Sequence, residues 1–319
     1  MEEKEIDLRQ ASNEVFGQGY LQDFDLEYAT TQNNVVIKGS VTMAVDEKRA
    51  FRLPIYTRKT TKDGEDSKTF IYLDALIREK ESVDSIVNIM KEDKDKKTAL
   101  NYARKIQFNG SVEPYGYINK EGSMVFPISS KKGLNVRVNS LGSAVETAEK
   151  LFEPKVKFNC EMFINKMEKE KVEDVETGRG LITTTLPLYG GDVATLNLVV
   201  LAPARDQAFG LYSVNDTAKL SGYYNLDIEV VSQDEEEETS WGWGEAPEKR
   251  VTTRNTYEMV LTGGSNPYGA QNEKAYKRED IDIARAEKFE KLQKNNEEYL
   301  AKKETQESTP TPKKGFKFE

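Results

Sequence analysis

The chain has 319 residues and a formal net charge of −9, and 37% of its residues are hydrophobic. This length suffices for two domains of ordinary size, and no apolar run reaches the roughly eighteen residues of a membrane-spanning helix. There is no histidine and only one cysteine, which excludes imidazole catalysis, Cys/His zinc sites and an intramolecular disulfide. We therefore expect a non-enzymatic cytoplasmic protein with no cofactor, metal or membrane partner.

The first region alternates as β-strands do. In NNVVIKGSVTMAV, every second residue from Val35 to Val45 is apolar except Gly39, which is the period-2 pattern of a half-buried strand. A further strand is expected in GYLQDFDLEY, which begins at Gly19. These two segments are typical of a hairpin.

The next segment, RAFRLPIYTRK, begins at Arg49 and combines basic and aromatic residues. Phe51, Leu53 and Ile55 share one parity, so the other parity is predicted to face outward. Cations that follow phosphates and rings that stack on bases are what non-specific binding of single strands requires. We expect five residues here to contact nucleic acid: Arg49, Arg52, Tyr56, Arg58 and Lys59.

SKTFIYLDALI, which begins at Ser67, is interpreted as the following strand. In that interpretation Ile71 and Leu73 face the core, while the outward row extends the binding surface: Lys68, Phe70 and Tyr72. The alternative is that a helix or the second domain covers the aromatic side chains and that the arginines are ordinary solvated charges.

A helix is predicted over 83–90, and strands return from Lys105. The segment after that strand adds further candidate nucleic-acid contacts: Tyr115, Tyr117, Lys131, Lys132 and Arg137. Lys-Lys-Gly is also common in ordinary hairpin turns, so these residues are weaker candidates than those of 49–59.

A second series of alternating strands runs from Lys155 to Gly264. Its first segment, KVKFN, resembles KIQFN at Lys105, which suggests that one fold is used twice; chance similarity between amphipathic strands is the alternative.

We expect a mainly β protein with a few helices, built from two tandem barrels of the oligonucleotide/oligosaccharide-binding (OB) type. A sandwich is the alternative architecture. The predicted domains are 1–148 (with an inserted helix), 149–268, and a charged helix with a disordered tail over 269–319.

Two aromatic pairs are candidate partner-binding residues. Trp241 and Trp243 lie in a long loop between two strands, beside an acidic run. Phe316 and Phe318 lie in the predicted disordered tail, where they could act as a short recognition peptide.

The chain resembles bacteriophage single-stranded DNA-binding replication proteins with OB folds. The resemblance rests on GYLQDFDLEY with VIKGSVTMAV, on FRLPIYTRK and on SVNDTAKLSGYYNLDIEVV, and it covers residues 16–265. It implies a protein that protects single-stranded DNA, with RNA as the other possible ligand, during replication or recombination. Such proteins often end in an acidic tail, whereas this one ends in TPKKGFKFE. The alternative function is that of a structural or assembly protein whose tandem β-domains bind other proteins.

Overall fold

The structure is a computed structural model that describes residues 8–31, 34–61, 63–92, 94–147, 151–232, 251–269 and 271–307. Five strands form a first barrel: β1 (Asn13–Thr31), β2 (Asn34–Ala44), β3 (Ala50–Arg58), β4 (Lys105–Val112) and β9 (Val136–Ser143). β1 pairs antiparallel with β2 and β4, β2 pairs with β3, and β4 pairs with β9. β9 also lies beside β3, which closes the barrel.

Five later strands form a second barrel: β10 (Lys155–Val172), β11 (Val175–Pro187), β12 (Val193–Val200), β13 (Thr217–Ser232) and β14 (Val251–Gly264). β10 pairs antiparallel with β11 and β13, β11 pairs with β12, and β13 pairs with β14. A short parallel pairing of β12 with β14, from Leu198 to Val200, closes this barrel.

Both barrels have the strand order 1-2-3-5-4-1 of the OB fold, which is a five-stranded Greek-key barrel. Helices α1 (Lys68–Arg78), α2 (Ile86–Met90) and α3 (Lys96–Tyr102) connect the third and fourth strands of the first barrel. Helix α4 (Ala202–Leu211) occupies the same place in the second. The helix predicted over 83–90 is present in shorter form as α2.

The two similar segments at Lys105 and Lys155 are not the same strand of the repeated fold. KIQFN belongs to β4, the fourth strand of the first barrel, and KVKFN begins β10, the first strand of the second. Both pair antiparallel with β1, one on each side of it. Their similarity therefore reflects two amphipathic strands that flank a shared neighbour.

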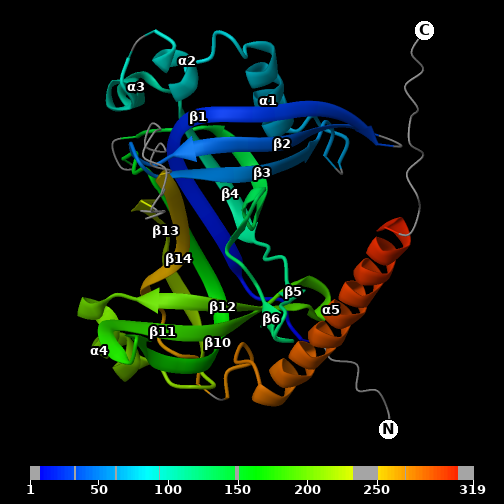
Figure 1. The fold of residues 1–319 in the computed structure, drawn as a ribbon, viewed down its shortest axis with the longest axis vertical. Helices are drawn as coiled ribbons and strands as arrows, with labels where there is room; N and C mark the ends of the chain where they lie inside the picture. The colour runs from blue at the N-terminus through cyan, green and yellow to red at the C-terminus, as the bar shows by residue number, and fades with distance from the viewer. Residues whose placement is uncertain are drawn as a thin grey trace, which may run out of the picture.

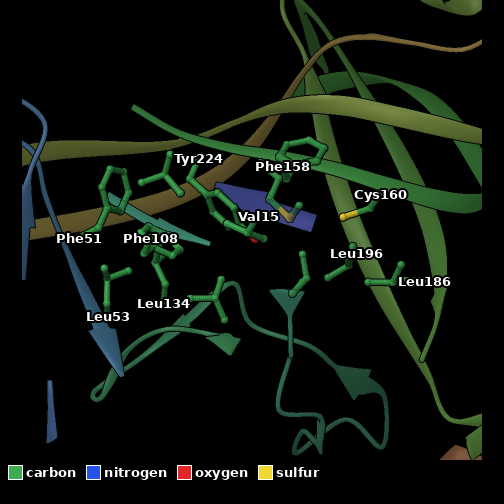
Figure 2. Close-up of a cluster of buried hydrophobic side chains, with 14 of the residues drawn as sticks. Val15, Phe51, Leu53, Phe108, Leu134, Phe158, Cys160, Leu186, Leu196 and Tyr224 are labelled. Atoms are coloured by element: carbon green, nitrogen blue, oxygen red, sulfur yellow. The ribbon is translucent and has the colours of Figure 1, made fainter. Parts of the chain in front are cut away.

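The core is continuous across both barrels because β1 belongs to one barrel and is hydrogen-bonded to the other. Val15 is opposite Gly110 of β4 on one side and Phe158 of β10 on the other. Figure 2 shows Phe108 and Phe158 in one cluster with Val15. Cys160 is buried in the same core, and burial raises the pKa of its thiol to about 12. Because one core spans both barrels, the domain boundaries at 148 and 268 stay a prediction.

The smaller elements lie in the connections. The segment between β4 and β9 carries two small hairpins, β5 (Tyr117–Ile118) with β6 (Met124–Val125) and β7 (Ser129–Ser130) with β8 (Gly133–Leu134). A short 3-10 turn, η1 (Tyr189–Gly191), joins β11 to β12.

The predicted C-terminal helix is present as α5 (Arg278–Glu307), which runs along one side of the molecule (Figure 1). The predicted fold class is therefore confirmed as mainly β, with two OB-like barrels and a C-terminal helix; the predicted disordered tail, 308–319, lies outside the described residues. None of the helices in the described ranges is long and apolar enough to cross a membrane.

Candidate nucleic-acid interface

Strand β3 carries the exposed basic row that the sequence predicts. Phe51, Leu53 and Ile55 are buried, because alternate side chains of a strand point to opposite faces. The residues that alternate with them are exposed: Arg52, Tyr56 and Arg58. The Tyr56 side chain is 57% exposed, so its ring is open to a stacking partner. Lys59, which follows the strand, is also exposed.

The neighbouring strands make the charge of this face uneven. Lys38 of β2 is opposite Tyr56 and adds a cation that the sequence analysis did not select, although it has the outward parity of its strand. On the far side of β2, β1 presents the exposed carboxylates Asp23, Asp25 and Glu27. Glu27 pairs with Lys38 at 3.0 Å. The positive charge is therefore concentrated on β3 and on the side of the face away from β1.

The hairpin β7–β8 brings more cations to that side. β8 lies beside β3, and the approach is close enough that a Cβ on Gly133 would lie 2.1 Å from the carbonyl oxygen of Arg52. Gly133 also has φ +118°, which favours glycine. The turn before it presents Lys131 and Lys132 to solvent. Two of the weaker candidates thus lie next to the strongest segment.

Arg137 is exposed on β9, the strand beside β3. Among the described residues, no ion pair involves Arg52, Arg58, Lys59 or the other exposed cations on this side, Lys131, Lys132 and Arg137. Their charges are therefore available for phosphate groups.

The interpretation of 67–77 as a strand was wrong. Lys68–Arg78 form helix α1, whose N-cap is the Ser67 hydroxyl, which accepts a hydrogen bond from the Phe70 amide. Phe70 is 6% exposed and packs in the core with Leu73 and Leu76. Tyr72 packs against the same core, and burial raises the pKa of its hydroxyl.

Phe70 and Tyr72 are thus removed from any base-stacking surface. Lys68 is exposed, but it begins α1 instead of extending the β3 row.

Arg49 is held by its own loop. Its guanidinium pairs with Asp46 at 2.6 Å, and its Nη1 atom lies 3.4 Å from the amide oxygen of Asn225 on β13. Burial alone would raise the pKa of Asp46, but hydrogen bonds from the backbone and side chain of Arg49 lower it. Arg49 therefore connects the β2–β3 loop to the second barrel and is a poorer phosphate ligand than Arg52.

Tyr115 and Tyr117 lie elsewhere. They line a groove against α5 together with Leu292, Asn295, Asn296 and Tyr299. No β3 residue is among the described residues that line this groove. The structure therefore does not bring the two tyrosines onto the β3 face.

The predicted partner-binding residues lie outside the described residues. Trp241 and Trp243 are within 233–250, the segment that connects β13 to β14. Phe316 and Phe318 are within 308–319. Their roles stay predictions.

The second barrel has a different face over its second and third strands. Thr183 of β11 is opposite Asn197 of β12, and their side chains are 3.0 Å apart. Thr185 and Thr195 form the next pair, in which Thr195 is half-buried and Thr185 is fully buried. In the parts of β11 and β12 described here, the outward residues are thus mostly neutral, and the basic-aromatic row belongs to the first barrel.

The fold and this face define a tandem OB-barrel protein whose first barrel carries the basic-aromatic strand β3. The family model YorF matches residues 11–298, so the chain belongs to the YorF family. No curated protein matches the chain.

Two solved structures of the single-stranded DNA binding protein from Thermus aquaticus show a distant likeness. A deletion mutant has a TM-score of 0.40 and 9% identity, over 83% of this chain and 99% of that chain. The wild-type protein has a TM-score of 0.38 and 11% identity, over 83% of this chain and 97% of that chain. Likenesses at this level do not establish a shared function.

Proposed function

We propose that this protein binds single-stranded nucleic acid, DNA in the first instance, across the β3 face of its first barrel. The observation that carries the proposal is the exposed row Arg52, Tyr56 and Arg58 on the third strand of an OB barrel. The face over strands 2 and 3 and the loop between strands 4 and 5 are where OB folds bind oligonucleotides. Here that loop supplies Lys131 and Lys132.

The proposed mechanism is sequence-tolerant. Every base has a π face that can stack on the Tyr56 ring, and each stacked base is worth about 1–3 kcal/mol. The cations around the ring follow the phosphates and supply the salt-dependent part of the affinity. We propose that the protein uses this binding to protect single strands during replication or recombination of a phage or mobile element. Replication proteins would then be recruited through the C-terminal region.

A fluorescence anisotropy titration of labelled oligo-dT at several salt concentrations tests the proposal. Single strands lose affinity with a slope of about −0.7 per neutralised phosphate in a plot of log K against log salt. The six cations without an ion pair among the described residues, Arg52, Arg58, Lys59, Lys131, Lys132 and Arg137, therefore predict a slope of about −4.2. Oligo-rU under the same conditions measures the preference between DNA and RNA. Absence of binding at low salt would refute the proposal and favour a protein-binding role for the barrels.

A further inference from the structure

A groove with aromatic walls lies between the β5–β6 hairpin of the first barrel and helix α5. Its volume is about 300 Å³, and its walls include Tyr115, Tyr117, Leu292, Asn295, Asn296 and Tyr299. Tyr115 is 73% exposed and Tyr299 is 65% exposed, so both rings are accessible from solvent. In Figure 1, α5 passes alongside β5. Residues 115–118, which include β5, form the opposite wall of the groove.

The helix that forms one wall is fixed at its N-terminal half. Ile281 and Ala284 are buried in the main core, and Lys288 pairs with Asp192, which follows η1 in the second barrel, at 2.7 Å. Leu292 is the next buried residue on the helix. Residues three, four and seven positions later lie on the same face of a helix, which places Asn295, Asn296 and Tyr299 opposite Tyr115 and Tyr117. One wall of the groove is thus a helix anchored on the second barrel, and the other wall is formed by residues 115–118 of the first barrel.

The chemistry of the walls fits a flat, uncharged aromatic ligand. The lining has three phenol rings, which offer stacking faces, and two carboxamides, which each donate and accept hydrogen bonds. None of the described residues that line the groove carries a charge. A nucleobase has both features, a π face and polar edges, whereas a phosphate would find no cation inside.

Continuity with the β3 face favours a base over other aromatic ligands. One connection, from β4 to β9, carries Tyr115 and Tyr117 at the groove and Lys131 and Lys132 next to Arg52. A strand that leaves the β3 face over the lysine turn can therefore follow the same loop to α5. Proline-rich peptides also bind grooves with aromatic walls. The cations of the connecting loop, Lys131 and Lys132, favour a phosphate backbone over such a peptide.

We propose that this groove binds a base of the same single strand that crosses β3, with α5 as part of the binding surface. The inference rests on the proposed function, and it adds a second contact point. It predicts that the groove is reached only by oligonucleotides longer than those that fill the β3 face. An OB fold typically covers about 4–16 nucleotides, so an oligo-dT series from about 4 to about 30 nucleotides separates the two contacts.

The test compares Tyr299→Ala with Tyr56→Ala in the full chain. Tyr299→Ala should leave binding of the shortest oligonucleotides unchanged and weaken binding of the longest by about 5- to 150-fold, the loss of one stacked base. Tyr56→Ala should weaken binding at every length. Tyr299→Phe keeps the ring and should bind as the wild type does. Tyr102→Ala removes a tyrosine of similar exposure, 64%, on α3 and should have no effect.

A direct readout complements the affinities. Photocrosslinking of a long oligonucleotide that contains 5-iodouracil should label peptides that carry Tyr115, Tyr117 or Tyr299. The inference is overturned if Tyr299→Ala binds every length as the wild type does while Tyr56→Ala is impaired. Binding of a proline-rich peptide that Tyr299→Ala abolishes, with oligonucleotide binding unchanged, would also overturn it. Absence of oligonucleotide binding by the wild type would instead refute the proposed function itself.

Discussion

Replacement of Tyr56 by alanine isolates the stacking part of the proposed interface. Tyr56 is on the outward parity of β3, 57% exposed, between the exposed Arg58 and the half-buried Pro54. Its neighbour across the strand pair is Lys38. The mutation removes a ring from the surface and leaves the buried residues Leu53 and Ile55 untouched, so the core of the barrel should be unaffected.

The expected loss of affinity follows from the removal of one ring on which a base can stack. One stacked base contributes about 1–3 kcal/mol, so the dissociation constant for oligo-dT should rise about 5- to 150-fold. The slope against log salt should stay near its wild-type value, because no phosphate ligand is removed. Replacement of Tyr by Ala at an exposed strand position lowers the free energy of unfolding by at most about 1 kcal/mol. Anisotropy titrations at three or more salt concentrations measure both quantities.

The control is Tyr56→Phe, which keeps the ring and loses only the hydroxyl. It should bind oligo-dT nearly as the wild type does. The reasoning fails if Tyr56→Ala, shown to be folded by its circular dichroism and melting temperature, retains wild-type affinity. In that case β3 would not be part of the binding surface. A change in the salt slope without a change in affinity at low salt would equally contradict a stacking role.

Three further predictions address the loop, the core and the tail. Lys131→Ala combined with Lys132→Ala should reduce the magnitude of the salt slope by about 1.4, the loss of two phosphate contacts; an unchanged slope would place the turn outside the interface. Cys160, whose thiol pKa burial raises to about 12, should resist iodoacetamide at pH 8 in the native protein and react fully in urea, as followed by mass spectrometry; rapid native labelling would contradict its burial. Deletion of 305–319 should leave the melting temperature and the affinity for oligo-dT near wild type while it abolishes recruitment of replication partners, and a large fall in melting temperature would show that the tail belongs to the core.

The strands could be predicted because their pattern is local. In β3 the buried residues alternate with exposed ones, and in β2 the predicted inward residues Ile37, Val41 and Met43 are buried. That period is visible without knowing any partner strand. The helix α1 was misinterpreted because its sequence, KTFIYLDALIR, is a short run of aromatic and branched residues. In so short a run, the strand period of 2 and the helix period of 3.6 are hard to separate. The deciding signals were the Ser67 cap and the spacing of Phe70, Leu73 and Leu76.

The candidate site was only partly predictable because part of it depends on distant contacts. The exposed row of β3 follows from parity within nine residues. The position of Tyr115 cannot be predicted from a local pattern, because its neighbours in the groove, Asn296 and Tyr299, are more than 170 residues later in the chain. No periodicity indicates that a C-terminal helix anchored on the second barrel through Lys288 also meets a hairpin of the first. Contacts of that kind come from the packing of two barrels against one helix.

The net charge of −9 is compatible with the proposed nucleic-acid-binding face because of where the acids lie. Neighbouring strands are about 4.8 Å apart, so the carboxylates of β1 are about 10 Å from the β3 row, on the other side of β2. This distance is about one Debye length at 0.1 M salt, so at physiological ionic strength the acids only weakly offset the cations of β3. Glu27 is further neutralised by its pair with Lys38. In the proposed complex, the same acids would repel phosphates from the β1 side and direct a bound strand toward β9 and the lysine turn.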